Sequence, residues 1–348
     1  MKVLFVFSGN SRQFPISPFT KAQADSLRDK GVEVSYFPIQ GKGMRNYFKN
    51  ISPLRKHLKT NAYDLIHAHY SLCGWVAVLA AAGRVPVVLS LMGDDAQGTF
   101  TGKNKVALKS RYLIWLTRLL QPFVQAIISK SALLEKAVYR KSISYVIPNG
   151  VRLDQFKLYP GGCREELGLE PGKKYVLFLG NPADPNKNIT LVQGAVRRLN
   201  RPDVALVSVY PVSHDQVVKY LNSVDVFTLC SFGEGSPNVV KEAMACNCPQ
   251  VVTPAGDAEW VVQDTAGCFV AGYDPQDFAQ KLDAALEFAA RAGRTKGRER
   301  LLQLGLDSEA VAEKIIQVYR TALGARAPAP PGGQRPAAPA REITPVSE

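Results

Sequence analysis

Short apolar runs recur along the chain, and most are followed by a segment whose apolar positions have helical spacing. In the first half such runs occupy residues 2–8, 32–37, 64–70, 86–92 and 125–131. In the second half they occupy residues 175–180, 204–209, 224–230 and 250–253. Short buried strands that alternate with helices are typical of parallel sheets covered on both faces. The pattern therefore predicts an α/β protein, and its 348 residues suit two doubly wound domains with a cleft where the strand ends converge.

The last part of the chain differs in composition from the rest. Residues 308–323 have apolar positions at helical spacing, whereas residues 324–348 are dominated by Pro, Ala and Gly and contain almost no large apolar side chains. A segment of that composition cannot bury enough apolar surface to offset the entropy of ordering. We therefore predict an amphipathic helix over residues 308–323 and a disordered tail over residues 324–348.

One stretch of the second half combines a strand, a tight turn and a helix start. The apolar run at 224–230 leads into Ser-Phe-Gly-Glu-Gly-Ser-Pro-Asn-Val at residues 231–239, and helical spacing follows as far as residue 246. Ser236 and Pro237 suit the N-cap and the first position of a helix. The free N–H groups and the positive dipole end of a helix start favour a phosphate or diphosphate.

Two carboxylates flank this helix start. Glu234 lies in the turn, and Glu242 lies about six residues into the helix, roughly 9 Å along its axis. A carboxylate accepts two hydrogen bonds at once and so can hold a vicinal diol. A nucleotide sugar has one diol on the hexose and one on the ribose, with the diphosphate between them. For an isolated pair, the alternative is that Glu242 lies on a solvated helix face and Glu234 caps a turn.

The carboxylates are part of a longer pattern. Glu, seven residues and Glu are followed by Ala-Met-Ala-Cys at residues 243–246 and by Pro-Gln-Val-Val-Thr at residues 249–253. This pattern resembles the signature of family GT4, the large retaining group of glycosyltransferases with the GT-B fold. The resemblance extends over nearly all of residues 1–323. It is greatest to a subgroup with Gly-Asn-Pro and Lys-Asn within residues 180–188 and Glu-Gly-Ser-Pro-Asn at residues 234–238.

The resemblance implies a division into two Rossmann-like domains that face a central cleft. Residues 1–155 would form the acceptor-binding domain, and residues 156–323 the domain that binds the nucleotide sugar. The string Ile-Pro-Asn-Gly-Val at residues 147–151 looks like the passage between the domains of GT4 proteins. The last helix of the second domain is expected to pack back on the first.

The resemblance also assigns residues to the donor. The expected donor-binding residues of the helix start are Gly235, Ser236, Pro237, Asn238 and Val239, with Glu234 on the hexose and Glu242 on the ribose.

A second donor loop follows the strand at residues 175–180. Many relatives have an Arg where this chain has Asn181, so Lys187 is the one cation left in this loop. A lone Lys in a surface loop is usually only solvated. At the cleft edge, Lys187 is expected to stabilise the charge that develops on the departing diphosphate.

The first domain contributes further candidates. Gly9, Asn10 and Ser11 follow the first strand, in a loop that reaches the donor diphosphate and the acceptor in GT4-like enzymes. His69 lies at the carboxyl end of its strand, where ligands of open α/β sheets bind, whereas His67 is more typical of a satisfied core histidine.

The loop after residues 86–91 departs from the family pattern. Met92 stands where many relatives have a His that contacts the sugar or acceptor, and Met cannot replace its hydrogen bonds. Asp95 matches an Asp that commonly follows, and it is expected to position an acceptor hydroxyl. The predicted catalytic residues are therefore Glu234, Lys187, Asp95 and His69.

These assignments predict a retaining glycosyltransferase that moves a hexose from a UDP-, GDP- or ADP-sugar to a sugar, lipid-linked or glycan acceptor. Its expected role is in the synthesis of a cell-surface polysaccharide or glycolipid. The acceptor proton would pass to the departing phosphate oxygen, so no protein base is required. The sequence shows no set of metal ligands, and we expect neither a metal nor a cofactor.

The positive charge is confined to the first half. Residues 1–150 contain 21 Lys and Arg against 7 Asp and Glu, whereas residues 151–348 contain 22 against 23. Two basic segments with interleaved aromatic and apolar residues, at 42–59 and 103–120, suit helices on an anionic membrane surface. The alternative is an ordinary amphipathic helix with a solvated basic face.

The apolar runs bear on localisation as well. The first is too short for the core of a signal peptide, and the longest tract, 75–92, is broken by Gly83, Arg84 and Pro86. We therefore expect a cytoplasmic protein, peripheral at the inner face of the membrane if the basic segments bind lipid.

Two other functions remain as alternatives. The basic half suggests a nucleic-acid-binding protein, although no recognisable module accompanies the charge and no specific nucleic acid is expected. The second alternative is a GT-B enzyme that is not a transferase, such as a sugar-nucleotide epimerase. Such an enzyme would modify or release a nucleotide sugar without an acceptor.

Overall fold

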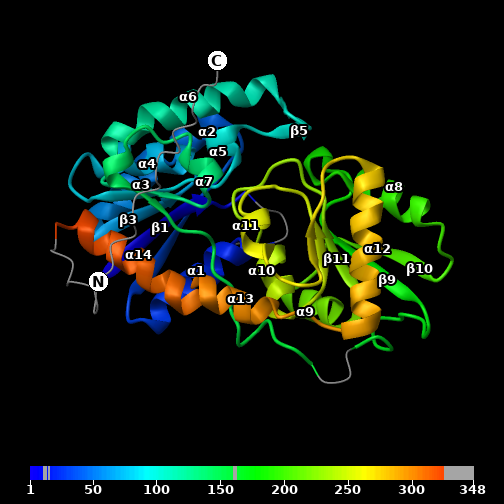
Figure 1. The fold of residues 1–348 in the computed structure, drawn as a ribbon. Coiled ribbons are helices and arrows are strands. Elements are labelled where there is room, and N and C mark those ends of the chain that lie inside the picture. The colour runs from blue at the N-terminus through cyan, green and yellow to red at the C-terminus, as the bar shows by residue number, and fades with distance from the viewer. Residues whose placement is uncertain (11–13, 15, 160–162, 325–348) are drawn as a thin grey trace, which may run out of the picture.

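The chain forms two parallel sheets, each covered by helices on both faces (Figure 1). The computed structural model describes residues 1–10, 14, 16–159 and 163–324. The strand order is β2-β1-β3-β4-β7-β8 in the first sheet and β10-β9-β11-β12-β13 in the second. In both sheets the order reverses beside the first strand, and open α/β proteins bind ligands at the carboxyl ends of the strands at such a point. The predicted α/β fold with two doubly wound sheets is confirmed. The predictions for Ser11 and for residues 325–348 lie outside the described residues.

The first sheet is built from strands of which the inner ones are buried on both faces and the two edge strands only in part. They are β1 Lys2–Ser8, β2 Glu33–Ile39, β3 Leu65–His69, β4 Val87–Ser90, β7 Ala126–Ser129 and β8 Ser144–Val146. The helices around it are α1 Pro18–Asp29, α2 Met44–Phe48, α3 Ile51–Thr60, α4 Ser71–Ala81, α5 Asp94–Gln97, α6 Arg111–Leu120 and α7 Ala132–Glu135. One face packs on α3, α4 and α6, and the other packs on α1.

The second sheet is shorter but has the same layered arrangement. Its strands are β9 Lys174–Leu179, β10 Val204–Val209, β11 Val226–Leu229, β12 Gln250–Val252 and β13 Cys268–Val270. Its helices are α8 Ile189–Leu199, α9 His214–Ser223, α10 Asn238–Ala245, α11 Ala258–Val262, α12 Pro275–Ala292 and α13 Gly297–Leu304. Helices α8 and α12 cover one face, and α9, α10, α11 and α13 cover the other.

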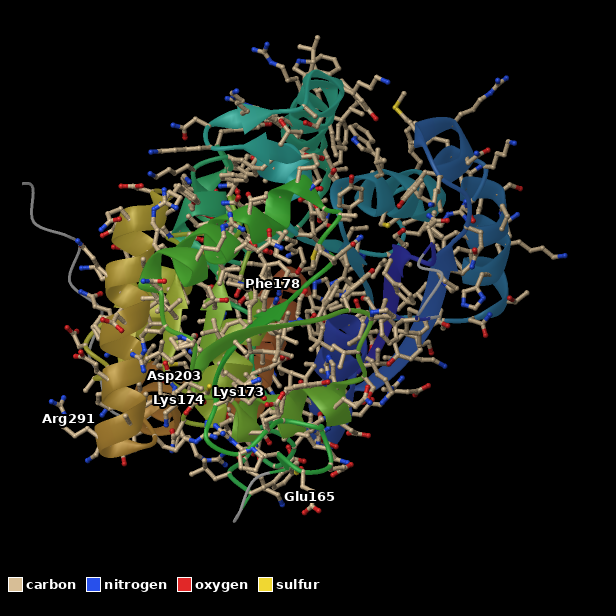
Figure 2. All side chains as sticks on the ribbon, turned by 90° about the vertical axis from the view of Figure 1, so that its right-hand side faces the viewer. Glu165, Lys173, Lys174, Phe178, Asp203 and Arg291 are labelled. Atoms are coloured by element: carbon tan, nitrogen blue, oxygen red, sulfur yellow. The ribbon has the colours of Figure 1, made fainter. Side chains whose placement is uncertain are left out.

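Charged side chains at the amino ends of the second sheet are paired with one another. Figure 2 shows Lys173, Lys174 and Asp203 at this end, with Phe178 farther along β9 in the core. Arg201 contacts Asp203 at 2.9 Å, and Lys173 contacts Glu170 at 2.7 Å. The charges at this end of the sheet are therefore used by the fold itself.

The final helix, α14 Ser308–Ala322, follows the second domain in sequence but packs on the first sheet, beside α1 (Figure 1). Lys30 pairs with Glu309 at 3.1 Å and with Glu313 at 2.8 Å. The Tyr319 ring is fully buried, and its hydroxyl lies 2.6 Å from Nδ1 of His67. The helix thus completes the apolar core of the domain from which it is most distant in sequence.

The two basic segments fold differently from the single helices expected for them. Residues 42–59 are divided into α2 and α3. Residues 103–120 begin in a small hairpin, β5 Phe100–Gly102 and β6 Lys105–Val106, and become α-helical only at α6. The hairpin reaches the second domain, where the ammonium of Lys103 lies 5.8 Å from the Tyr273 ring centre.

The helices also bear on whether the chain could cross a membrane. Within the described ranges, no helix has both the length and the apolar composition needed to cross a bilayer.

Candidate active site

The glycine-rich turn after β11 lies directly against the first domain. A Cβ atom at Gly235 would lie 2.5 Å from the carbonyl oxygen of Met92, and one at Gly233 would overlap the Phe100 ring. Only glycine allows such a close approach at these two positions. The Gly-Glu-Gly turn therefore marks where the carboxyl ends of the two sheets meet.

The residues after this turn form a buried polar network. Lys241 and Asp257 pair at 2.8 Å with almost no exposure, and the Ser236 hydroxyl bonds to both of them at 2.8 Å. The backbone N–H of Asn149, in the passage between the domains, donates to the same hydroxyl at 3.1 Å. The predicted N-cap role of Ser236 is wrong, because this network takes up its hydroxyl and α10 begins at Asn238 without a side-chain cap. Ser236 instead links the end of the Gly-Glu-Gly turn to Asn149, in the passage between the domains.

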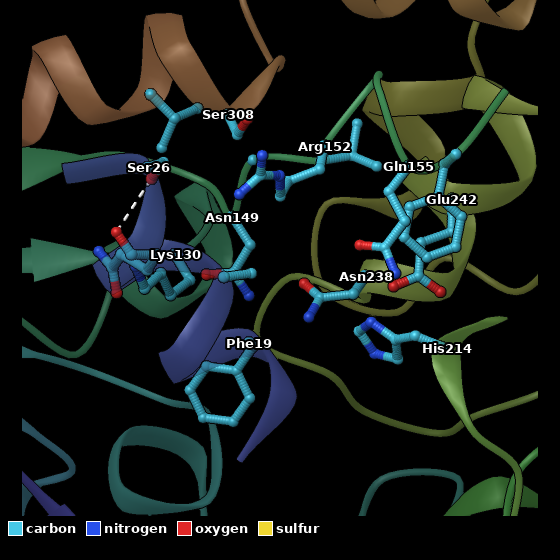
Figure 3. Close-up of a pocket in the computed structure, with 16 residues that line it drawn as sticks. Phe19, Ser26, Lys130, Asn149, Arg152, Gln155, His214, Asn238, Glu242 and Ser308 are labelled. Carbon is cyan, nitrogen blue, oxygen red and sulfur yellow. Dashed lines mark hydrogen bonds between the residues drawn. The ribbon is translucent and has the colours of Figure 1, made fainter. Parts of the chain in front are cut away.

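Glu242 lies on α10 at the wall of a pocket between the domains. Its side chain is 4% exposed, and burial raises its pKa to about 7 although the neighbouring Lys241 lowers it. Among the described residues, no side chain donates a hydrogen bond to this carboxylate. The Oδ1 atom of Asn238, one turn earlier, is also buried without a partner. Figure 3 shows both residues beside His214, at the start of α9, on the second-domain side of the pocket.

Glu234 and Lys187 meet at the cleft edge. Their charged atoms are 2.5 Å apart, and the side chains are 18% and 30% exposed. Burial lowers the pKa of Lys187, but the Glu234 carboxylate outweighs this effect and the pKa is raised. Asn186 holds the turn in place, because its side-chain amide donates to the Gly233 carbonyl at 2.9 Å. The structure thus brings together the two residues that the sequence analysis assigned to the hexose and the departing diphosphate.

The remaining loop residues mainly shape the backbone. The side-chain oxygen of Asn181 accepts a hydrogen bond from the backbone N–H of Ala183 at 3.0 Å. Asn10 donates to the Gly41 carbonyl at 3.0 Å, and a Cβ atom at Gly9 would lie 2.7 Å from Pro38. Donor contacts by these residues, and by Pro237 and Val239 at the start of α10, stay predictions.

Asp95 does not face the cleft. It is fully buried, and burial raises its pKa to about 6 although backbone N–H groups lower it. One carboxylate oxygen accepts from the N–H of Ser71 at 2.9 Å, and the other accepts from Met92 at 2.9 Å and Gly93 at 3.1 Å. The expectation that Asp95 positions an acceptor hydroxyl is corrected: it holds the β3–α4 and β4–α5 loops together.

Asp94 is the carboxylate of this pair that reaches the cleft. Its pKa is raised because surrounding atoms shield it from water and because the carboxylates of Glu234 and Asp184 lie nearby. Lys187 opposes that shift. Asp94 was assigned no separate role from the sequence, although its position after a strand could have indicated one.

His69 is also placed differently from the expectation. It is 2% exposed and packs against Phe5 and His67, with ring centres 4.7 and 4.2 Å away. Burial, together with the charge of Lys130, lowers its pKa to about 3. The imidazole is therefore neutral and lies beneath the surface, so the expectation that it faces the open cleft is corrected. Neither of its ring nitrogens has a partner.

The structure adds residues that the sequence analysis did not single out. Lys130 directly follows β7, and it lines the same pocket as Gln23 of α1 and Glu242. The available signal was a lysine placed immediately after a buried strand, at the carboxyl edge of the sheet. The burial of that lysine depends on α1 and on the second domain, which no local pattern shows.

Across the described parts of the chain, no three His, Cys, Asp or Glu side chains are grouped so as to hold an ion. The expected metal independence stays a prediction.

Comparison with known families gives a match in each half. The family described as Glycosyltransferase Family 4 matches residues 11–155, and the family described as Glycosyl transferases group 1 matches residues 198–287.

Among the curated relatives is D-inositol 3-phosphate glycosyltransferase 2 of Catenulispora acidiphila. It is 28% identical over an alignment of 283 residues, and the match covers 65% of this chain and 63% of the relative. The protein TuaC of Bacillus subtilis, named for a glycosyltransferase of teichuronic acid biosynthesis, is 28% identical over 222 residues, 56% of this chain and 54% of TuaC. The chain thus spans less than two thirds of the length of either relative.

Solved structures with the same fold are more distant in sequence. Sucrose-phosphate synthase from Thermosynechococcus elongatus superposes with a TM-score of 0.75 at 17% identity, covering 93% of this chain and 99% of that one. Anabaena HepE, solved in complex with UDP and glucose, superposes with a TM-score of 0.70 at 17% identity, covering 91% and 98%. These likenesses confirm the predicted GT-B fold. With a family match in each half, the chain is similar to the glycosyltransferases of family 4 in its first domain and of group 1 in its second.

Proposed function

We propose that this protein transfers a hexose from a nucleoside-diphosphate sugar to an acceptor hydroxyl with retention of the anomeric configuration. The carrying observation is a pair of acceptors in the pocket between the domains: Asn238 Oδ1, which is buried without a partner, and the Glu242 carboxylate, which is 4% exposed and accepts no hydrogen bond from a described side chain. Leaving buried acceptors without donors costs free energy, so their retention favours a ligand that supplies hydroxyl groups. A ribose diol has that chemistry, and His214 on the same wall suits the nucleobase.

The other end of the donor would lie at Glu234 and Lys187. In the present arrangement Glu234 neutralises Lys187. When a donor binds, Glu234 would accept hydrogen bonds from the hexose hydroxyls, which frees the ammonium for an oxygen of the diphosphate. Lys187 would then act where negative charge grows as the bond from the anomeric carbon to the diphosphate breaks, because a preorganised cation stabilises that charge most in the transition state.

The second half of the reaction concerns the acceptor. Its hydroxyl oxygen forms the new bond to the anomeric carbon, and its proton passes to the oxygen of the departing diphosphate. Because the proton passes to the departing diphosphate, the proposal requires no protein base. Asp95, which is enclosed by backbone groups, and His69, which is buried, are not placed to act as one.

A donor screen tests the proposal. Purified protein is incubated with UDP-, GDP- and ADP-hexoses and with simple glycoside or lipid-linked acceptors, and nucleoside diphosphate release is measured together with product structure by NMR. One donor class should be consumed with the donor anomer retained. The Lys187→Met substitution should lower turnover by about 100-fold. Lys296→Met, at a side chain that is 84% exposed, should leave it unchanged.

Two outcomes would contradict the proposal. Conversion of a donor sugar to another sugar nucleotide without nucleotide release would indicate an epimerase. An inverted product would show that the retaining assignment is wrong.

A second proposal concerns the surface on which the protein binds a lipid-linked acceptor. We propose that α6 and the turns flanking it bind an anionic lipid surface at the inner face of the membrane, as a lipid-linked acceptor in cell-surface polysaccharide or glycolipid synthesis would require. The most exposed apolar side chains there are Leu108 at 77%, Trp115 at 61%, Phe123 at 54% and Tyr112 at 50%. They share the segment with Lys109, Arg111 and Arg118, and residues 103–123 contain no Asp or Glu. Apolar and cationic groups on one face match the interface of an anionic bilayer.

Vesicle flotation tests the lipid proposal. The protein should float with vesicles that contain phosphatidylglycerol and not with pure phosphatidylcholine, and Trp115→Ser should weaken the flotation. Trp260→Ser is a matched control, since Trp260 is 42% exposed but lies in the second domain. Equal binding by wild type and Trp115→Ser, or no binding at all, would show that the basic face is only solvated.

A further inference from the structure

The first-domain wall of the pocket contains hydrogen-bond donors without acceptors. Lys130 is 2% exposed, and its Nζ has no hydrogen-bond partner among the residues that the structure describes. Nε2 of Gln23, on the neighbouring helix α1, is buried and unpartnered as well. Figure 3 shows Lys130 and Glu242 on opposite sides of the pocket, with Asn149 and Asn238 between them. An ammonium that is buried and unpaired is costly, because its lost hydration is not replaced.

The nearby charges do not satisfy Lys130. Asp257 is a nearby negative charge, but both of its carboxylate oxygens are already bonded to Lys241, at 3.1 and 2.8 Å. Lys241 places a second positive charge near Lys130, and His69, on β3 of the same sheet, is neutral. The first-domain wall therefore has an excess of donors and positive charge. The opposite wall has two acceptors, Asn238 Oδ1, which is buried without a partner, and the Glu242 carboxylate.

We propose that Lys130, with Gln23 beside it, binds a phosphate group of a substrate of the transferase. This inference rests on the proposed function and adds to it a cation from the first domain, in addition to Lys187 in the second. A phosphate supplies several charged acceptors, which match an ammonium and an amide N–H group that have none. The phosphate could belong to the donor diphosphate or to a phosphorylated acceptor, and the chemistry of recognition is the same.

Titration of Lys130 is consistent with this geometry. Burial, together with the positive charge of Lys241, lowers its pKa to about 8, although Asp257 opposes the shift. A bound phosphate would raise the pKa again, because an anion within contact distance favours the charged ammonium.

Calorimetry on the full-length protein tests the proposal with the Lys130→Met variant. UDP, GDP and ADP are compared with uridine, guanosine and adenosine for the wild type and the variant. If Lys130 binds the donor diphosphate, the variant should bind the preferred diphosphate about 10- to 100-fold more weakly and the matching nucleoside equally well. Its melting temperature without ligand should be unchanged or higher, since an unpaired buried charge has been removed.

Inorganic phosphate distinguishes the second source. If diphosphate affinity is unchanged, phosphate added to the nucleotide-saturated protein should still stabilise the wild type against heat but not Lys130→Met, which would assign the site to the acceptor. The proposal is overturned if neither measurement differs between the two proteins, or if the nucleoside and the diphosphate are weakened equally. A loss of thermal stability with unchanged affinities would also overturn it.

Failure of this inference can be told apart from failure of the proposed function. Glu242→Ala should weaken both the nucleoside and the diphosphate, because its expected contact is with the ribose. If Glu242→Ala has no effect, the proposed function fails. If only Lys130→Met has no effect, the assignment of Lys130 fails and the rest stands.

Discussion

Glu242 illustrates how burial sets the chemistry of a single residue in this pocket. Its carboxyl pKa is raised to about 7, so near neutral pH it is close to half protonated in the free protein. The ionised form accepts strong hydrogen bonds from a diol on both of its oxygens, whereas protonation turns one oxygen into a donor and weakens the acceptance. In the proposed complex, nucleotide affinity therefore depends on the protonation state of Glu242. The sequence alone would suggest an ordinary glutamate that is fully ionised at neutral pH.

This dependence gives a prediction about pH. Because the folded-state pKa is raised, Glu242 is ionised above about pH 7 and protonated below it. Nucleoside affinity should fall by about tenfold from pH 8 to pH 6, one decade for each unit below the pKa. Calorimetry with the nucleoside avoids the titration of the phosphates. In Glu242→Gln the affinity should be low and independent of pH across this range. A wild type without pH dependence would contradict the assignment.

Asp95 is the opposite case, a carboxylate used wholly by the fold. Asp95→Ala leaves the N–H groups of Ser71, Met92 and Gly93 without their acceptor, so the free energy of unfolding should fall by about 3 kcal/mol. Asp94→Ala is the matched control, because Asp94 is only partly shielded from water and its carboxylate, among the described residues, accepts a hydrogen bond from Thr99 alone. Its free energy of unfolding should change by about 0.5 kcal/mol or less. Denaturant unfolding measures both. If Asp95→Ala is as stable as the wild type but loses transfer, the residue acts on the acceptor after all.

At the scale of elements, the turn between β11 and α10 couples the two domains. Gly235→Ala would place its Cβ 2.5 Å from the Met92 carbonyl oxygen, so the domains could not keep their present contact. Turnover should fall at least about tenfold while each domain stays folded. Gly272→Ala is the control, since its Cβ would meet only the Asp277 carboxylate, at 3.5 Å. Equal turnover in the two variants would show that the contact is not needed for catalysis.

Much of the secondary structure could be predicted from local patterns. The apolar runs identified the strands of both sheets, and the Glu-containing turn was placed correctly between a strand and a helix. The hairpin β5–β6 was missed because its strands are short and polar, and because it is stabilised by a contact between Phe100 and Gly233, far away in sequence. Ser236 was misassigned for a similar reason: a buried pair, Lys241 with Asp257, competes for its hydroxyl.

The candidate site could be predicted only in part. The second-domain candidates Glu234, Lys187 and Glu242 were identified because strand ends and a spaced motif point to them. Lys130 and Gln23 were not, because they become a site only when α1, β7 and the second domain come together. The depth of His69 was likewise invisible locally, since it results from packing against Phe5.

At the scale of the whole molecule, the chain is organised so that its two sheets direct their carboxyl ends toward each other. Helix α14 returns to the first domain and is fixed there by Tyr319 and by two ion pairs to Lys30. The charges at the amino ends of the second sheet are paired (Figure 2), whereas the unpartnered atoms of Lys130, Gln23 and Asn238 lie in the pocket between the domains (Figure 3). Unmet hydrogen-bonding capacity is thus found where a donor would bind.

The central claim is that this pocket holds the nucleotide of a sugar donor. The most direct measurement is calorimetric titration of UDP, GDP and ADP into the wild type and Glu242→Ala at pH 8. We predict that one of the three binds the wild type in a one-to-one ratio and that the affinity falls at least about tenfold in the variant. No binding by any of the three to the folded protein, or equal binding by both proteins, would contradict the account.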